Sequence, residues 1–192
     1  MLFRSVPDLA AAANRMLAEL RMPQRAVAEV RDFVGKGTAK LVERCLGVNR
    51  ARFDEAMPIF NRVYREESGK HSKVFPRVIE GLQAIADAGL PMGCVTNKPG
   101  EFTLPLLQET GLVRYFIVVV SGDTVATRKP DPLPMRYACE RLGVATQESL
   151  VVGDSENDVQ AARAAGCPVV CVPYGYREGL DRKSTRLNSS HT

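Results

Sequence analysis

The sequence predicts an α/β fold in which a doubly wound parallel sheet follows an N-terminal all-helical unit. Two observations lead to this prediction. Apolar residues recur with the helical period up to about residue 70, and from residue 74 onward short apolar strands alternate with helical segments. Alternation with short connections implies right-handed crossovers, which make the strands parallel and cover both faces of the sheet with helices.

The helical unit is predicted at residues 6–73. Ser5 can cap its first helix, Pro7 stands in the first turn, and apolar residues from Leu9 to Leu20 follow at helical spacing. Three more helices are expected at 27–33, 39–46 and 53–64.

The α/β unit is predicted at residues 74–181. Its strands are short apolar runs, expected at 92–95, 116–120, 150–152 and 169–172. Its helices are expected at 78–86, 102–109, 132–142 and 159–165.

The composition is that of a cytoplasmic globular protein of 192 residues with no membrane or nucleic-acid partner. No apolar run is long enough to span a membrane, and the five cysteines lack a metal-binding spacing, so we expect reduced and mostly buried thiols. The net charge of +4 comes largely from residues 182–192, which hold three basic residues and no acidic one. This tail resembles translated sequencing-adapter sequence, and we expect both it and residues 1–4 to be non-native.

A cation site is predicted where the apolar run 150–152 ends at Gly153. Asp154 and Asp158 follow, and carboxylates four residues apart on a first helical turn lie on one face. Open α/β sheets bind ligands beyond the carboxyl ends of their strands, and oxygen ligands favour Mg²⁺. We therefore expect Asp154 and Asp158 to hold Mg²⁺. The alternative is a helix N-cap followed by a solvent-exposed acid.

Polar residues in the same context, Thr96-Asn97 and Lys129, complete a phosphoryl site. Pro130 and Pro132 restrict the backbone beside Lys129, and a rigidly held ammonium suits a fixed anionic target. The alternatives are an ordinary surface lysine and an ordinary strand-end turn.

Taken in chain order, Thr96-Asn97, Lys129 and the run 153–158 resemble the second, third and fourth motifs of the haloacid dehalogenase superfamily of phosphohydrolases. The resemblance extends from about Ser5 to Leu180. Within the superfamily it is strongest to the bacterial phosphoglycolate phosphatases, on the residues 96–99, 122–124, 129–134 and 174–176.

The resemblance implies a role for each of these residues. Asp154 would bind Mg²⁺ directly, and Asp158 would act through water or by orienting the other ligands. Lys129 would neutralise the transferred phosphoryl group, while the Thr96 hydroxyl and the Asn97 backbone amide would donate to its oxygens.

The resemblance also makes the helical unit a cap domain. A glycine-bearing loop of such a cap lies over the active site, and here Gly35, Lys36 and Gly37 would bind substrate, with Lys36 meeting a substrate carboxylate. The alternative is a plain helix connection, since glycine is the usual helix C-cap.

The first motif of the superfamily, a strand ending in Asp-x-Asp-Gly-Thr, should immediately precede Ser5, where the chain has Met1-Leu2-Phe3-Arg4. We therefore expect a truncated chain that lacks its nucleophile and is inactive as written. In the family this strand lies in the middle of the sheet, between the strands that end at Thr96 and Gly153. Its absence should leave two central strand edges unpaired.

The full-length parent is expected to hydrolyse a small phosphomonoester, 2-phosphoglycolate by resemblance, with Mg²⁺ and an aspartyl-phosphate intermediate. One alternative is a non-catalytic phosphate-binding protein. Another is a receiver-type signalling module, although receivers place the acidic pair before the lysine along the chain. The exact substrate and the oligomeric state stay open at this point.

Overall fold

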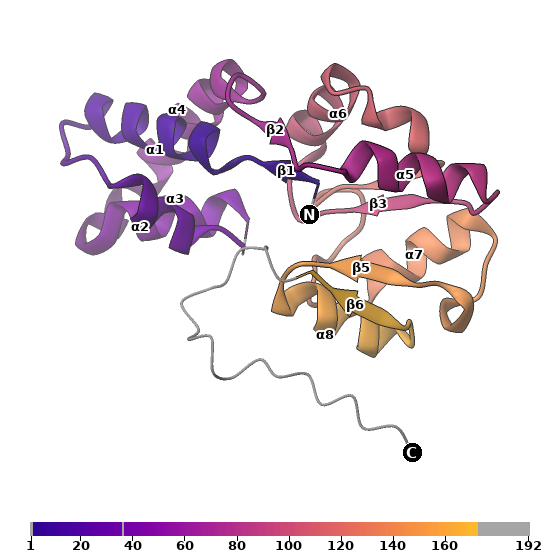
Figure 1. The fold of residues 1–192 in the computed structure, drawn as a ribbon. Helices are drawn as coiled ribbons and strands as arrows, with labels where there is room; N and C mark the ends of the chain where they lie inside the picture. The colour runs from indigo at the N-terminus through magenta and orange to yellow at the C-terminus, as the bar shows by residue number, and fades with distance from the viewer. Residues whose placement is uncertain (1, 36, 173–192) are drawn as a thin grey trace.

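The computed structural model describes residues 2–35 and 37–172 of the chain. All-helical and alternating segments occupy opposite ends of the molecule in Figure 1. The expectations for Lys36, for residues 173–181 of the α/β unit and for the tail lie outside the described residues.

The helical end is built from four helices whose apolar faces share one core. These are α1 (Val6–Glu19), α2 (Val27–Phe33), α3 (Thr38–Leu46) and α4 (Phe53–Glu67), with the 3-10 turn η1 (Gly47–Arg52) before α4. Met16, Leu17, Phe60 and Tyr64 are fully buried in this core, and Phe102 joins it from the α/β end. The predicted helices are confirmed, and α4 runs three residues beyond its expected end at 64.

The chain passes between the helical end and the α/β end twice, and these two segments pair as short antiparallel strands, β1 (Phe3–Arg4) and β2 (Lys73–Val74). Asp8, fully buried in the first turn of α1, holds the return crossing in place. Its carboxylate accepts hydrogen bonds from Gly69 N at 3.0 Å, His71 N at 2.7 Å and Ser72 Oγ at 2.5 Å.

The α/β end contains parallel strands joined through helices, as predicted. The strands are β3 (Gly93–Val95), β4 (Val118–Val120), β5 (Val151–Gly153) and β6 (Val169–Cys171). The helices are α5 (Val78–Asp87), α6 (Gly100–Glu109), α7 (Leu133–Leu142) and α8 (Glu156–Ala165), with 3-10 turns η2 (Leu112–Tyr115) and η3 (Thr146–Glu148).

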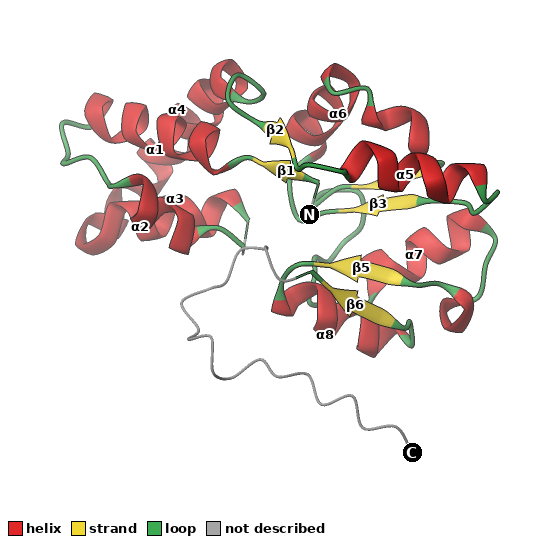
Figure 2. Cartoon of the chain, in the orientation of Figure 1, coloured by secondary structure: helices red, strands yellow, loops and turns green. Residues whose placement is uncertain are grey.

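The parallel strands form two separate pairs, β3 with β4 and β5 with β6. Figure 2 shows the arrows of β5 and β6 side by side and apart from β3. Met92 O accepts a hydrogen bond from Ile117 N, and Thr96 N donates one to Val120 O, so both residues face β4. Because backbone groups alternate along a strand, those of Gly93 and Val95 point to the opposite edge of β3. Within the described residues β3 and β5 therefore each keep one unpaired edge, as the sequence predicts.

Coverage of both sheet faces was also predicted, and this is wrong for β5 and β6. Val152 and Val170 are 58% and 53% exposed. The reason is that the helices cover the two strand pairs unequally. Both α5 and α7 pack with β3 and β4, whereas α8, which shares a core cluster with α7, packs against β5 and β6. Because no strand among the described residues joins the two pairs, α5 does not extend over the second one.

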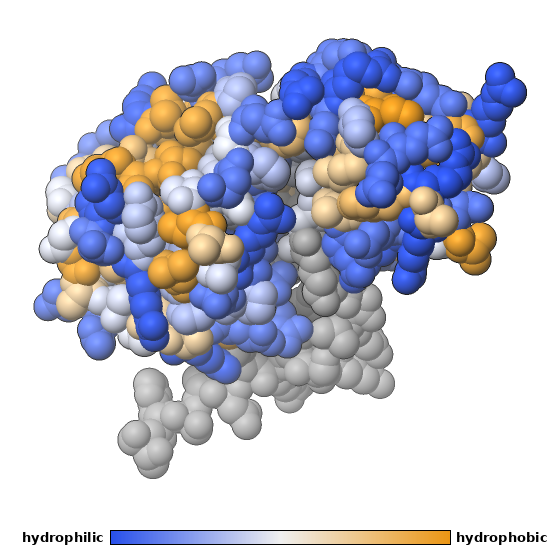
Figure 3. Space-filling view, turned by 180° about the vertical axis from the view of Figure 1, so that it is seen from behind, coloured by the Kyte–Doolittle hydropathy of each residue, from blue (hydrophilic) through white to orange (hydrophobic). Residues whose placement is uncertain are grey.

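The surface mixes polar and apolar residues over both ends of the molecule, as Figure 3 shows for the rear face. None of the described helices has both the length and the apolar composition needed to cross a membrane. None of the five cysteines, all of which lie among the described residues, forms a disulfide bond, and Cys45, Cys139 and Cys167 are buried as expected.

Candidate active site

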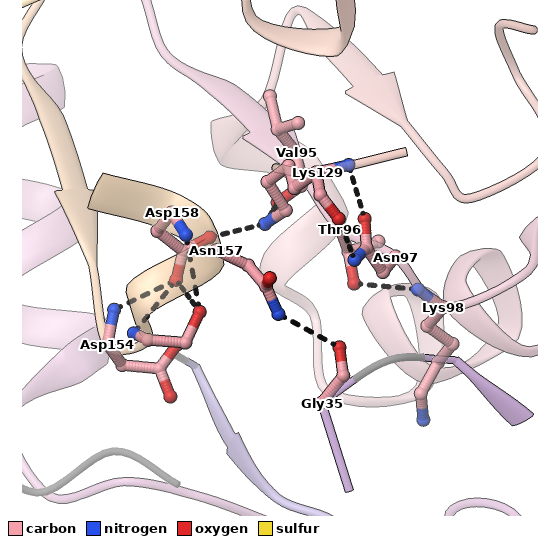
Figure 4. Close-up of polar contacts among 10 residues, drawn as sticks. Gly35, Val95, Thr96, Asn97, Lys98, Lys129, Asp154, Asn157 and Asp158 are labelled. Atoms are coloured by element: carbon pink, nitrogen blue, oxygen red, sulfur yellow. Dashed lines mark hydrogen bonds and ion pairs between the residues drawn. The ribbon is translucent and has the colours of Figure 1, made fainter. Parts of the chain in front are cut away.

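The candidate site lies where the chain leaves the carboxyl ends of the parallel strands (Figure 4). Thr96 and Asn97 follow β3, Lys129 lies in the loop between β4 and α7, and Asp154 follows β5. The hydrogen bonds described below join all three segments, so the structure brings the predicted residues together.

Lys129 is a buried lysine that links the two strand pairs. Its ammonium donates to Val95 O at 2.7 Å, on the open edge of β3, and forms an ion pair with Asp158 Oδ1 at 2.6 Å. The side chains of Lys129 and Asp158 are 11% and 7% exposed. The alternative of an ordinary surface lysine is therefore wrong.

Asn97 fixes the backbone of Lys129 through its side chain. Asn97 Nδ2 donates to Lys129 O at 2.8 Å, and Lys129 N donates to Asn97 Oδ1 at 3.0 Å. This reciprocal pair holds the lysine loop against the end of β3. From the sequence only the Asn97 backbone amide was expected to act, because bonds from a side-chain amide to a backbone 32 residues away cannot be predicted from motif spacing.

Thr96 has the turn geometry of the simpler alternative. Its backbone N–H donates to Val120 O at 2.8 Å, and its hydroxyl oxygen accepts from Lys98 N at 3.1 Å. The hydroxyl hydrogen is not used by any contact among the described residues, so a turn role and donation to a ligand oxygen are compatible.

Asp158 is an internal anchor. Its Oδ2 accepts from Asp154 N at 3.0 Å, Ser155 N at 3.1 Å and Ser155 Oγ at 2.8 Å, which closes a capping box at the start of α8. Burial acts to raise the pKa of Asp158, but the Lys129 ammonium and these donors outweigh it and hold that pKa below its usual range. Gly153 is required here, because a Cβ would collide with the Asp158 side chain.

Asp154 and Asp158 do not share a helical face, contrary to the prediction. The N-cap is Ser155, and α8 begins at Glu156, so Asp154 belongs to the turn before the helix. Nor is Asp158 the solvent-exposed acid of the alternative, since it is 5% exposed. In Figure 4 the Asp154 carboxylate lies on the far side of the turn from the Lys129 ammonium.

The described residues contain no group of three or more His, Cys, Asp or Glu side chains that could hold a metal ion. A magnesium ion retains several waters and needs only one or two protein carboxylates beside its phosphate ligand. Both oxygens of Asp158 are already engaged, whereas Asp154 lies in the turn directly after β5, at the strand end where such a site is expected.

Gly35 and Gly37 reach this site from the helical end. Asn157 Nδ2 donates to Gly35 O at 3.4 Å, and a Cβ on Gly37 would lie 3.2 Å from Arg128 Nη1. A pocket of about 460 Å³ at this site is lined by Asn97, Arg128, Lys129 and Asn157, among other residues of the α/β end. A larger and more open depression of about 1030 Å³, on the outer side of the Arg128 loop, includes none of the predicted phosphoryl-site residues.

Comparisons with known proteins identify the family of the chain. The family model described as haloacid dehalogenase-like hydrolase matches residues 2–172. The chain belongs to this family. The haloacid dehalogenase-like chain is 49% identical over 184 residues to a phosphoglycolate phosphatase of Thiobacillus denitrificans, covering 93% of the chain and 81% of the relative. A phosphoglycolate phosphatase of Escherichia coli K12 is 39% identical over 197 residues, covering 91% of the chain and 78% of the relative.

A crystal structure of a "predicted phosphoglycolate phosphatase" from Haemophilus somnus matches the haloacid dehalogenase-like chain with a TM-score of 0.85 and 31% identity. The match covers 93% of the chain and 84% of the solved structure. The fold class predicted from the sequence is thereby confirmed.

One contact in this haloacid dehalogenase-like hydrolase was missed by sequence reasoning. Lys98 Nζ donates to the Tyr64 hydroxyl at 2.7 Å and lies 5.2 Å from the centre of the Tyr64 ring, which joins α4 to the loop after β3. Burial lowers the pKa of Lys98 to about 8, and the negative charge of Asp8 opposes this only in part. No periodicity could indicate a lysine whose partner lies 34 residues away.

Proposed function

We propose that this protein is a phosphomonoester hydrolase of the 2-phosphoglycolate phosphatase type, which uses Mg²⁺ and an aspartate nucleophile. The observation that carries the proposal is the buried Lys129 ammonium, held by Val95 O and Asp158 at the carboxyl ends of the parallel strands. Relatives named phosphoglycolate phosphatase, of similar sequence over most of the chain, support the substrate.

Each residue of the site has a role in this proposal. Lys129 offsets the charge of the phosphoryl group, and Asn97 keeps Lys129 in position. The Thr96 hydroxyl and the Asn97 backbone amide donate to phosphoryl oxygens, and Asp154 holds Mg²⁺. When bound, the metal supplies positive charge that stabilises the transferring phosphoryl group. Asp158 orients Lys129 and the Asp154 turn rather than contacting the metal.

The proposal assigns residues 6–73 to a cap domain and residues 74–181 to the catalytic core. The cap loop Gly35-Lys36-Gly37 then closes over the substrate, excludes bulk water and presents Lys36 to the substrate carboxylate. Support comes from the contact of Gly35 with Asn157 across this interface. A small phosphorylated substrate and a cytoplasmic location belong to the same proposal.

The chain as written contains no Asp-x-Asp-Gly-Thr segment, and we propose that it is therefore inactive. The unpaired edges of β3 and β5 support this, because they flank the position at which the family carries its nucleophile strand. The same observation favours a second function, non-catalytic phosphate binding, since the groups that would hold a phosphate are all present.

Hydrolysis assays on two chains test the proposal. One is the chain as written, and the other is extended at its N-terminus by a strand ending in Asp-x-Asp-Gly-Thr. With Mg²⁺ and a panel of phosphomonoesters, we expect the extended chain to hydrolyse 2-phosphoglycolate with the highest kcat/KM and the chain as written to release no phosphate above the blank. An extended chain in which the first aspartate is replaced by asparagine is the matched control.

If the extended chain hydrolyses none of the esters but both chains bind phosphate, the second function is correct. Turnover by the chain as written, abolished in its Asp154→Ala variant, would contradict the proposed inactivity and require another nucleophile.

A further inference from the structure

Arg128 stands between the catalytic loop and the helical end of the molecule. It directly precedes Lys129, and its Nε donates to Gly122 O at 2.6 Å, which fixes the base of the guanidinium against the loop that follows β4. The two remaining nitrogens of the group are thus presented from a fixed point rather than from a freely moving side chain.

One of these nitrogens, Nη1, lies beside Gly37 of the helical end. Gly37 has a φ of +87°, and a Cβ at that position would lie 3.2 Å from Arg128 Nη1. The guanidinium therefore lies directly under the loop that reaches the site. Arg128, Asn97, Lys129 and Asn157 line the same pocket of about 460 Å³.

Arg128 also differs from many arginines of the chain in its partners. Arg15, Arg52, Arg62 and Arg65 each form an ion pair with a glutamate. Among the described residues, no carboxylate lies within ion-pair distance of Arg128. The Arg128 guanidinium is therefore a fixed positive charge in a pocket that also contains Lys129. Such a group is suited to bind an anionic group of a ligand.

We propose that Arg128 is a specificity-determining residue that binds the carboxylate of a short phosphorylated acid while Lys129 holds its phosphoryl group. The inference rests on the proposed function and deepens it by naming the residue on the core side that recognises the acid. The planar guanidinium suits a carboxylate, which it can bind through two parallel hydrogen bonds. Because Arg128 and Lys129 line the same pocket, the ligand that fits them best carries its two anionic groups a short distance apart, as a two-carbon substrate does.

The chain as written is suited to the test, because ligands can bind without being consumed. Isothermal titration calorimetry with Mg²⁺ present compares 2-phosphoglycolate with 2-hydroxyethyl phosphate, which has a hydroxymethyl group in place of the carboxylate. We expect Arg128→Gln to weaken 2-phosphoglycolate about tenfold and 2-hydroxyethyl phosphate less than twofold, since a hydrogen-bonded charge pair at a half-enclosed site contributes about this much. Arg128→Lys, which keeps the charge but loses the planar group, should give an intermediate loss.

Arg141→Gln is the matched control, because Arg141 on α7 is exposed, as Arg128 is, but does not line the pocket and should affect neither ligand. Equal effects of Arg128→Gln on the two ligands, or no effect on either, would overturn the inference and leave the proposed function standing. Failure of the unaltered chain to bind either phosphate ester would instead overturn the proposed function and the inference with it.

Discussion

Replacement of Lys98 by methionine should stabilise the protein at neutral pH and lose that advantage at high pH. Methionine retains most of the volume of the side chain but carries no charge. The Lys98 ammonium is held between α4 and the loop after β3, where its hydrogen-bond partner is the neutral Tyr64 hydroxyl.

The magnitude follows from the pKa. Burial lowers the pKa of Lys98 from 10.5 to about 8, and each tenfold change in proton affinity corresponds to about 1.4 kcal/mol. At pH 7 the charged lysine therefore costs the folded state on the order of 3 kcal/mol, reduced to about 2 kcal/mol by its partial exposure to solvent. Loss of the hydrogen bond to Tyr64 costs about 1 kcal/mol, so Lys98→Met should raise the free energy of unfolding by about 1 kcal/mol at pH 7.

The sign reverses with pH. Between pH 8 and pH 10.5 the unfolded chain keeps the Lys98 proton while the folded chain releases it, so the unaltered protein gains stability as the pH rises. At pH 10 about a quarter of the penalty remains, and the lost hydrogen bond now outweighs it, so Lys98→Met should be about 0.5 kcal/mol less stable than the parent.

Urea denaturation of parent and variant at pH 7 and pH 10 measures this difference. Lys73→Met, at an exposed lysine of β2, is the control and should show the same stability difference at both pH values. A Lys98→Met variant that is destabilised at pH 7 by the same amount as at pH 10 would refute the reasoning.

Three other substitutions test the anchors of the fold. Asp158→Asn leaves the buried Lys129 ammonium without its anion and should lower the free energy of unfolding by about 3–5 kcal/mol at pH 7. Because the pKa of Asp158 is held below 3.8, the parent should keep this contribution down to about pH 4 and lose it on further acidification, as an acid titration followed by circular dichroism would show. Asp8→Ala removes the acceptor of three hydrogen bonds and should cost about 3 kcal/mol in urea denaturation, whereas Asp32→Ala, at an exposed acid, should change stability by less than about 0.5 kcal/mol. Gly153→Ala forces a Cβ against Asp158 and should cost about 1–3 kcal/mol, with the loss measured as a lower Tm; an unchanged Tm would mean that the strand and helix separate without cost.

The order of helices and strands could be predicted from the sequence because it depends on local patterns. Apolar spacing located α1 to α4 within a few residues, and short apolar runs located β3 and β5. Exposure of Val152 and Val170 was not predicted, since it depends on which strand pair α5 packs against. That choice is a property of the whole sheet and not of any single segment.

The residues of the site could be predicted from the sequence, but the hydrogen bonds between them could not. Motif spacing brought Thr96, Asn97, Lys129 and Asp154 together, whereas the reciprocal bonds between Asn97 and Lys129 join side chain to backbone across a long loop. The placement of Asp154 before α8 also differed from the prediction, because Ser155 is the better-placed cap and takes the N-cap position. Such competition between neighbouring capping residues is decided by local geometry.

The most direct test of the phosphoryl site is the kcat of the N-terminally extended chain for 2-phosphoglycolate, measured with and without Lys129. We predict that Lys129→Ala lowers kcat by about 10² or more, since it removes a preorganised charge that acts on the transferring group, and that Asp154→Ala has an effect of similar size. Lys70→Ala, at a lysine that pairs with Glu67 near β2, should leave kcat unchanged. A Lys129→Ala chain that folds and retains nearly the parental kcat would contradict the assignment of this lysine and, with it, the proposed site.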